Sequence, residues 1–396
     1  MSVIYLELNK YRNFDIFDFE INANTIFIQG KNGTGKTNIL ESISLLAPGK
    51  GLRSANYKDI ILNNQDYWTL RAVLKHDTYC FNIDIEYLKN SKKKVSINES
   101  AAKQQELLNL SNIIWLTPQM LDLFTGSASN RRKFLDRMVM RFSHKHIDRV
   151  KSYEYLIQER MRILLSNSLN SSSTISWLST IEKQLSEQYF DIAIYRCKML
   201  RHINSALSGI KNFGFCDLTM HIIGSIENQI SQYSLGVNAS INEDYNNESN
   251  LLTSNGINNI TAQRSDLIDW SCEQYRNNRI KDMKRKQTHF GAHKSDFNII
   301  YNTKNINAKF CSTGEQKVIL TTLVLSETIT PPSFSQISSN KNTSNILLLD
   351  EIFTHLDLDY RELLAKFLTT INAQKFITTT ETEHLEYIHN ADKVYL

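Results

Sequence analysis

Apolar and polar residues alternate in the first part of the chain. Two strands are predicted by apolar residues two positions apart, at Ile4, Leu6 and Leu8 and then at Phe17, Phe19 and Ile21. The continuous apolar run TIFIQ, residues 25–29, is typical instead of a strand buried on both faces of a central sheet. Residues 68–97 are again strand-like, with a hairpin turn expected at 89–94.

Helical spacing of apolar residues first occurs at 39–46 and is stopped by Pro48-Gly49. Further helices are expected over 130–166, with Ser143 capping a second helix after a break, over 171–212 and over 263–286. Strand character returns at 297–301, 346–350 and 375–380. The sequence therefore predicts an α/β fold whose central sheet is divided in sequence by an inserted, mainly helical arm.

We expect three segments along the chain. Residues 1–115 and 290–396 form the two halves of one lobe, and residues 116–289 form the helical arm. Within the arm, residues 238–259 are rich in Asn and Ser and poor in large apolar groups. That composition is typical of a loop or an insertion, and no function is assigned to it.

Composition excludes several classes of protein. Apolar residues make up 41% and charged residues 22%, as in ordinary globular domains. We expect no membrane span, because no run approaches eighteen consecutive apolar residues. The N-terminus lacks the features of a secretion signal, and the five cysteines form no CxxC pair, so we expect reduced thiols in a cytoplasmic protein. A net charge of +4 is compatible with nucleic-acid binding but too small to predict it.

The motif GKNGTGKT at 30–37 predicts a phosphate-binding loop. It follows a buried strand and opens a helix, so backbone N–H groups can surround phosphates at a helix N-terminus. Lys36 supplies charge to the β- and γ-phosphates of a nucleotide, and the Thr37 hydroxyl can bind Mg²⁺. The predicted nucleotide-binding residues are Gly30, Lys31, Asn32, Gly33, Thr34, Gly35, Lys36, Thr37 and Asn38.

The run ILLLDE supplies the matching acidic residues. Asp350 is expected at the carboxyl end of a buried strand, where it can hold Mg²⁺ together with Thr37. Glu351 is then placed to orient or deprotonate an attacking water. ATP and Mg²⁺ are therefore the predicted cofactors, and the glutamate favours hydrolysis over phosphoryl transfer.

The stretch STGEQK at 312–317 predicts a second helix start. This stretch alone is compatible with two interpretations. It is either a simple helix cap or the second half of a composite site, in which one subunit closes on the ATP held by another. The order of parts favours the second interpretation. The phosphate loop, LTPQ, STGEQ, LLLDE, HLD and FITTTE follow one another as in ABC-type ATPases.

The resemblance to ABC-type ATPases implies roles for further residues. Ser312, Gly314, Glu315 and Gln316 would form the signature that contacts the partner's γ-phosphate. Asp357 would lie across the dimer interface, and Gln119 would couple the arm to Mg²⁺. The class usually has a histidine after the last strand. This chain has Thr378, Thr379 and Thr380 there, and Thr380 is assigned to coupling.

The sequence resembles one family within the ABC-type ATPases more specifically. The blocks LELNKYRNF, NRRKFLDR, FGAHKSDF, STGEQK and LLLDEIFTHLD resemble the RecF family of recombination mediators. That resemblance implies an ATPase lobe with a helical arm, an ATP-dependent homodimer that binds DNA at single-strand gaps or stalled forks, and slow hydrolysis that resets it. It also implies RecO and RecR as partners and the loading of RecA. Ala292, Lys294 and Ser295 depart from the family's usual GPHRDD, as Thr313 and Glu315 depart from the commonest ABC signature.

Two basic clusters are candidate DNA contacts, or else solvated helix faces. The first is Lys133, Arg137 and Arg141, spaced four residues apart and opposite Phe134 and Met138. The second comprises Arg279, Lys284, Arg285 and Lys286. Arg131 and Arg132 are expected to pair with the ATPase lobe, whereas Arg12 and Arg53 could touch nucleotide or DNA.

Three other classes of protein remain to be weighed. A transporter ATPase shares the motif order but needs a membrane partner and a differently built middle segment. An SMC or Rad50-like protein carries hundreds of coiled-coil residues between its halves, which this insert lacks. A small P-loop kinase has no use for the second helix start.

Overall fold

The computed structural model describes residues 2–166, 171–235, 264–329, 345–381, 388 and 391–396. The predicted Asn-rich segment, 238–259, lies outside the described residues. The chain divides into two compact units. Unit 1 comprises Met1–Leu121, Ala206–Cys216 and Cys311–Leu396, and unit 2 comprises Asp122–Ser205 and Asp217–Phe310.

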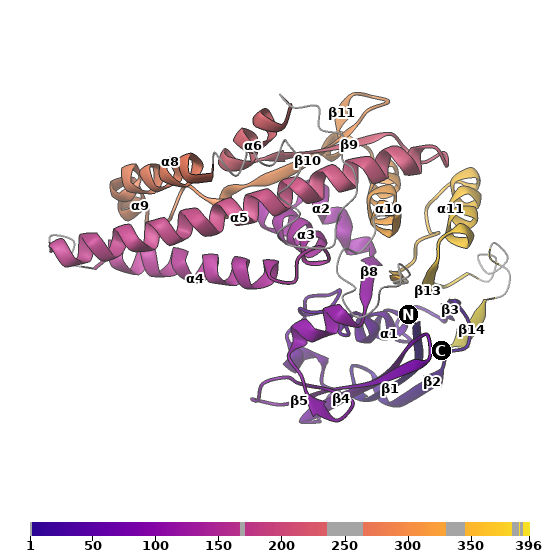
Figure 1. Ribbon diagram of the computed structural model, residues 1–396. Helices are drawn as coiled ribbons and strands as arrows, with labels where there is room; N and C mark the ends of the chain where they lie inside the picture. The colour runs from indigo at the N-terminus through magenta and orange to yellow at the C-terminus, as the bar shows by residue number, and fades with distance from the viewer. Residues whose placement is uncertain (1, 167–170, 236–263, 330–344, 382–387, 389–390) are drawn as a thin grey trace. The chain divides into compact units, whose positions relative to one another are not determined.

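A five-stranded parallel sheet is the centre of unit 1, in the order β14-β3-β13-β12-β8 (Figure 1). Its strands are β3 (Thr25–Gln29), β8 (Asn112–Leu116), β12 (Asn345–Leu349), β13 (Ala373–Thr379) and β14 (Asp392–Tyr395). Every residue of β12 and β13 is buried, as expected for strands covered on both faces. The strands predicted at 25–29, 346–350 and 375–380 are confirmed.

The second sheet of unit 1 is antiparallel and has six strands in the order β2-β1-β4-β5-β6-β7. These are β1 (Ser2–Tyr11), β2 (Phe14–Glu20), β4 (Tyr67–His76), β5 (Tyr79–Leu88), β6 (Lys94–Ile97) and β7 (Ser100–Ala101). The hairpin turn expected near 89–94 joins β5 to β6 and is confirmed. The alternation predicted for β1 is wrong at its start, because the register shifts between Val3 and Tyr5 and buries Val3 rather than Ile4.

One cluster of buried apolar side chains joins the two sheets of unit 1 to α1 (Lys36–Ser44). It includes Leu6 of β1, Ile85 of β5, Ile39 of α1, Leu348 of β12 and Phe376 of β13. Burial of this surface fixes α1 against the parallel sheet, and with it the loop that precedes the helix. The other helical segments of the unit are α10 (Thr313–Ile329), α11 (Leu358–Thr370) and the 3₁₀ turns η1 (Tyr57–Ile60), η2 (Gln104–Asn109) and η3 (Pro118–Leu121).

Unit 2 is mainly helical, as predicted for the arm (Figure 1). Its helices are α2 (Asp122–Thr125), α3 (Ala128–Met140), α4 (His146–Leu164), most of α5 (Ser172–Lys211), α6 (Ser225–Leu235), α8 (Arg264–Asn277) and α9 (Arg279–Arg285). It also holds an antiparallel sheet, β11-β10-β9, made of β9 (Leu218–Ile223), β10 (Asp296–Tyr301) and β11 (Ile306–Asn307), and the turns η5 (Ala292–Lys294) and η6 (Ala308–Phe310).

The boundaries of the two units differ from the predicted domain boundaries. Residues 290–310 belong to unit 2, because β10 pairs with β9 along its whole length. Residues 206–216 belong to unit 1, where the ring centroids of Phe213 and Phe215 lie 5.4 and 5.0 Å from that of Phe367 in α11. Neither contact is visible as a change in composition, so the boundaries could not be located from the sequence.

Two details of the predicted helices are wrong. Ser143 is not the cap of α4, since that position is Lys145 and the Ser143 hydroxyl accepts a hydrogen bond from Arg149 at 2.9 Å. The helix predicted over 263–286 is two helices that meet at Asn278. In the part of the chain that the structure describes, no helix is both long enough and apolar enough to cross a bilayer.

Candidate functional site

Residues 30–35 of the motif lie between β3 and α1, and Lys36 and Thr37 begin the helix, as the motif predicts. Gly33 and Gly35 have φ angles of 87° and 112°, in the region that favours glycine. A Cβ atom at Gly35 would lie 2.6 Å from Phe14 Cζ and 2.8 Å from Asn13 Oδ1. The positive φ favours glycine at this position, and the side chains of Asn13 and Phe14 would have to move to admit any larger residue.

Asn13 braces the loop, and sequence reasoning missed it. Its amide donates to the Thr34 carbonyl at 2.9 Å, and its Oδ1 accepts from the Asn38 amide at 2.6 Å. The preceding Arg12 forms a two-point ion pair with the buried Glu41 of α1, with an Nε–Oε2 distance of 2.7 Å. The RN pair of the block YRNF is the only signal that could have pointed to this support.

Lys36 is buried within the loop that it closes. Its Nζ donates to the Gly30 carbonyl at 2.7 Å and to the Lys31 carbonyl at 3.0 Å. Burial lowers the pKa of the Lys36 ammonium, while the negative charges of Glu351 and Asp350 act in the opposite direction. A poorly solvated cation held by two neutral carbonyls is well suited to bind an anion that enters the loop.

Asp350 joins three elements of unit 1 at the carboxyl edge of the parallel sheet. Its carboxylate is 5% exposed and accepts hydrogen bonds from Thr37 Oγ1 at 3.1 Å and from Thr378 Oγ1 at 2.7 Å. Burial raises the pKa of the Asp350 carboxyl, against the opposing effect of these two hydroxyls. The structure thus brings together Thr37 and Asp350, the two predicted Mg²⁺ ligands. A hydroxyl and a carboxylate fit this cation, which prefers oxygen ligands.

Thr378 also contacts Glu351, the predicted hydrolytic residue. The Glu351 N–H donates to Thr378 Oγ1 at 2.9 Å, and Glu351 has a φ of 49°. Lys317 of α10 donates to the Glu351 carbonyl at 3.3 Å and to Thr354 Oγ1 at 3.0 Å. Burial lowers the pKa of Lys317 to about 8. Side chains from β13 and α10 therefore hold the backbone on which Glu351 lies.

Thr378 was missed as a partner of Asp350, although the sequence carries a signal for it. In the sheet, Leu349 of β12 pairs with Ile377 of β13, so the next residues of both strands lie side by side. Aligning the ends of LLLD and FITT would have placed Asp350 beside Thr378. Thr379 turns away and its hydroxyl contacts the backbone of Glu381, and the predicted Thr380 is exposed beyond the strand.

The predicted coupling residues lie on two other segments of unit 1. Gln119 is exposed in η3, directly after β8, and the Asp350 N–H donates to the carbonyl of Leu116 at the end of that strand at 2.9 Å. Asp357 caps α11, since its Oδ1 accepts from the Tyr360 N–H at 2.8 Å. The structure shows these placements, and the coupling roles of both residues stay predictions.

The second helix start is a capped and exposed N-terminus. Ser312 Oγ donates to Glu315 Oε2 at 2.8 Å, and the Ser312 N–H donates to the same oxygen at 2.9 Å. Gly314 is exposed, and a Cβ atom there would meet no described atom within 4 Å beyond its own helix turn. Gln316 is buried. The fold of the chain itself therefore explains Ser312 and Glu315 as a cap, but gives no reason for a glycine at 314.

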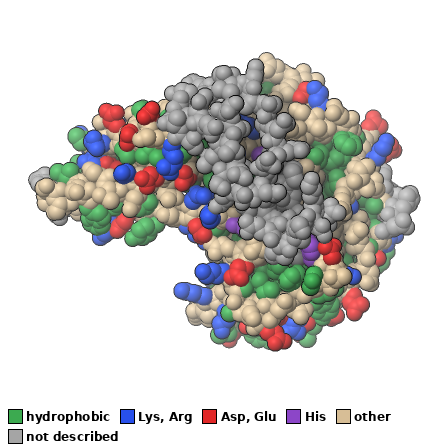
Figure 2. Space-filling view, in the orientation of Figure 1, with side chains coloured by type: hydrophobic (Ala, Val, Ile, Leu, Met, Phe, Trp, Pro, Cys, Tyr) green, Lys and Arg blue, Asp and Glu red, His purple; other side chains and the backbone are tan. Residues whose placement is uncertain are grey.

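The first predicted DNA-binding cluster does not form one exposed face. Lys133 is exposed, but Arg137 is half-buried with its Cζ 5.0 Å from the centroid of the Phe134 ring, and Arg141 is only 9% exposed. The prediction is wrong for Arg141, because this residue, which directly follows α3, is buried. In the view of Figure 2, acidic and basic side chains are mixed over the helices of unit 2.

The second basic cluster is divided between a buried network and the surface. Arg279 pairs with Glu182 at 2.5 Å, and Glu182 also accepts from the fully buried Arg160 at 3.1 Å. The prediction of a DNA contact is contradicted for Arg279, because its charge is already neutralised inside unit 2. The three remaining residues, Lys284, Arg285 and Lys286, are exposed at the end of α9 and stay candidates.

Arg131 and Arg132 are structural within unit 2, not partners of the ATPase unit. Arg131 Nε donates to Asp296 Oδ1 at 2.6 Å, and Arg132 Nη1 donates to the Ser295 carbonyl at 3.0 Å. Ser295, one of the departures from the family pattern, donates to the fully buried Glu227 at 2.6 Å. The predicted pairing with the ATPase lobe is wrong, because residues 290–310 belong to unit 2.

The sequence matches the family model described as "RecF/RecN/SMC N terminal domain" over residues 2–396. It is 37% identical over 383 residues to the DNA replication and repair protein RecF of Rickettsia massiliae (strain Mtu5), covering 96% of this chain and 95% of that protein. It is 38% identical over the same length to the RecF of Rickettsia akari (strain Hartford), with the same coverage. The chain belongs to the RecF family.

Solved structures show the same fold. "Structure of the recombination mediator protein RecF-ATPrS in RecFOR pathway" has a TM-score of 0.77 at 20% identity, covering 100% of this RecF-family chain and 96% of that chain. "Crystal structure of the SmcHead bound to the C-winged helix domain of ScpA" has a TM-score of 0.52 at 13% identity, covering 100% and 94%. The predicted α/β fold of an ABC-type ATPase lobe with an inserted helical arm is confirmed.

A stability measurement tests the buried charge of Asp350. Its folded-state pKa is raised, so folding favours the protonated form, and stability falls as the pH rises from the ordinary pKa of aspartate through that raised pKa. We expect Asp350→Asn to raise the free energy of unfolding in urea at pH 7 in the presence of EDTA. The gain should disappear in acid, below the ordinary pKa of aspartate, where the wild-type carboxyl is protonated in both states.

The control is Glu351→Gln, which removes the neighbouring charge from a half-exposed side chain. It should change stability little at either pH. An Asp350→Asn protein that is less stable than wild type at pH 7 would show that the charge is compensated in the apo fold.

Proposed function

We propose that the chain is a Mg-ATP-dependent DNA-binding recombination mediator. The observation that carries this proposal is the convergence of Thr37, Asp350 and Thr378 beside the phosphate-binding loop. It is supported by the relatives, which are named DNA replication and repair proteins, and by a solved neighbour that is described as a RecF-ATP recombination mediator in the RecFOR pathway. We place its action in the cytoplasm.

ATP would bind with its phosphates in the loop of residues 30–38. Backbone N–H groups at the start of α1 and the ammonium of Lys36 would face the phosphates. Thr37 Oγ1 and the Asp350 carboxylate would hold Mg²⁺, which supplies charge neutralisation on the phosphate oxygens. Glu351 would accept a proton from the attacking water, while Thr378 and Lys317 keep its backbone in place.

ATP would also join two copies of the chain. An exposed helix start with a glycine that the fold does not require, at Gly314, supports a close approach by another molecule. Ser312, Gly314, Glu315 and Gln316 would complete the nucleotide site of the partner, and Asp357, Gln119 and Thr380 would couple the two halves. Hydrolysis would then separate the subunits, so that ATP turnover acts as a switch.

The substrate and partners of this switch follow from family membership. We propose that the ATP-bound dimer binds DNA at single-strand gaps or stalled forks, that DNA stimulates a slow ATPase, and that RecO and RecR act with it in loading RecA. Lys133, Lys284, Arg285 and Lys286 are exposed cations of unit 2 that could contact phosphates. The helical insert of unit 2 argues against a transporter ATPase and against a long coiled coil.

Hydrolysis tests the role of Thr378. We expect Thr378→Val to reduce the rate of ATP hydrolysis about tenfold, the order expected when a hydrogen bond to a charged group is lost. The matched control is Thr379→Val, because that neighbouring hydroxyl contacts Glu381 instead of Asp350. Steady-state phosphate release measures both. Equal rates of hydrolysis for the two variants would contradict a role of the Thr378 hydroxyl in the site.

DNA binding tests the proposed function as a whole. A labelled duplex with a single-strand gap should bind more tightly with Mg-ATP than without nucleotide, as measured by fluorescence anisotropy. Lys284→Ala/Lys286→Ala should weaken binding roughly tenfold and lower the slope of log K against log salt by about 2, because two phosphate contacts are lost. Lys151→Ala/Lys183→Ala removes two exposed lysines elsewhere in unit 2 and is the control. An affinity for the gapped duplex that is the same with and without Mg-ATP would contradict the proposal.

A further inference from the structure

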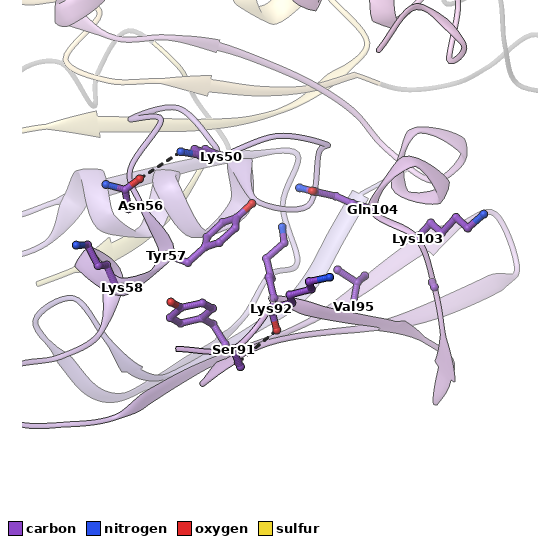
Figure 3. Close-up of a pocket in the computed structure, with 12 residues that line it drawn as sticks. Lys50, Asn56, Tyr57, Lys58, Ser91, Lys92, Val95, Lys103 and Gln104 are labelled. Carbon is purple, nitrogen blue, oxygen red and sulfur yellow. Dashed lines mark hydrogen bonds between the residues drawn. The ribbon is translucent and has the colours of Figure 1, made fainter. Parts of the chain in front are cut away.

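A basic pocket lies in unit 1, in the region of the antiparallel sheet. Its volume is about 780 Å³. Three segments line it: the chain between α1 and η1, the turn from β5 to β6, and the residues that lead into η2 (Figure 3). The lining includes five lysines: Lys50, Lys58, Lys92, Lys93 and Lys103. Nothing in the ATP-binding role proposed above uses any of them.

Within the described part of the chain, no carboxylate lines this pocket. The Nζ of Lys50 donates to the Asn56 side chain at 3.2 Å, which is a neutral partner. Among the residues that the structure describes, none of the five lysines forms an ion pair with Asp or Glu. Five cations around one concave surface repel one another, and a bound anion would relieve that repulsion.

Lys93 is the most unusual member of the set. Its Nζ is buried, has no hydrogen-bond partner among the residues that the structure describes, and lies 4.9 Å from the centroid of the Tyr57 ring. Burial lowers the pKa of Lys93 to about 8. A buried ammonium without a counter-charge destabilises the free protein. A phosphate bound in the pocket would supply the missing charge.

Aromatic side chains lie between the lysines. Tyr57 donates to the Gly49 carbonyl at 3.0 Å, which fixes its ring. Tyr87 stacks on the fully buried Trp68, with ring centroids 6.2 Å apart and an angle of 26° between the planes. Rigid aromatic rings among cations are the usual combination in sites for single-stranded nucleic acid, where bases stack and phosphates are neutralised.

We propose that this pocket binds a segment of single-stranded DNA, with lysines on its phosphates and a base against the tyrosines. Figure 3 shows Lys58 and Lys103 at opposite ends of the pocket, with Lys50 and Lys92 between them. Cations spread along a path match the repeated phosphates of a strand better than the clustered phosphates of one nucleotide. The inference rests on the proposed function and deepens it, because it names where unit 1 contacts the single strand of a gap.

Binding of a short labelled strand tests the inference. The full-length protein is titrated into a fluorescein-labelled dT oligonucleotide of about 12 nucleotides, the length suited to one such site. We expect Lys92→Ala/Lys103→Ala to weaken binding roughly tenfold and to lower the slope of log K against log salt by about 1.4. The control is Lys75→Ala/Lys366→Ala, which removes two exposed lysines of unit 1 outside the pocket.

Lys93→Met supplies a second and independent readout. It should weaken oligonucleotide binding several-fold and at the same time raise the thermal midpoint of unfolding, because it removes a buried and uncompensated charge. A lysine with a merely structural role would show the reverse, a lower midpoint with unchanged binding. That result would overturn the inference, as would pocket variants that bind like the control.

The outcomes separate this inference from the proposed function. If wild-type protein binds gapped duplex with ATP and the pocket variants bind the oligonucleotide normally, the pocket inference alone fails. If wild-type protein binds neither DNA, the proposed function fails as well. A pocket that binds dTMP or polyglutamate as tightly as the oligonucleotide would show that its occupant is a free nucleotide or an acidic protein, and would also overturn the inference.

Discussion

The buried carboxylate of Asp350 is the constraint on which the site depends. It lies at the end of β12 and accepts hydrogen bonds from Thr37 at the start of α1 and from Thr378 near the end of β13. The apolar core between the two sheets holds these three elements in register. The same carboxylate is destabilised by burial, as its raised pKa shows. A cation that binds beside it would neutralise this buried charge, and the relief of the destabilisation would favour cation binding.

Much of this arrangement could be predicted from the sequence. The phosphate loop and the acidic pair are local motifs, and a buried parallel strand places its last residue at the ligand-binding edge by geometry alone. Thr378 and Asn13 were missed because they depend on which strands are neighbours and in what register. Tertiary packing fixes both, so the ends of LLLD and FITT indicate the contact of Asp350 with Thr378 only once β12 and β13 are known to be neighbours.

Charge was a less reliable guide than motif. Arg141 and Arg279 belong to basic clusters in the sequence, yet the first is buried and the second neutralises Glu182 inside unit 2. A run of cations does not reveal which of them already have a partner. The basic pocket of unit 1 shows the opposite case. Its five lysines come from three separate segments, and only Lys92 and Lys93 are adjacent in the sequence. The predicted domain boundaries differ from those of the two units for a similar reason, since the pairing of β10 with β9 has no compositional signature.

The central claim, that ATP joins two copies through the helix start at Ser312, is tested most directly by molar mass. Light scattering is carried out on Glu351→Gln with and without Mg-ATP, and again after adding Gly314→Arg. Outside its own helix turn and chain neighbours, a Cβ atom at position 314 would meet none of the described atoms within 4 Å, and the same holds at Gly209, so Gly209→Arg is the control. We predict that ATP doubles the mass of Glu351→Gln and of the Gly209→Arg protein, and that Gly314→Arg stays a monomer. A monomeric Glu351→Gln at saturating ATP, or a Gly314→Arg dimer, would contradict the account.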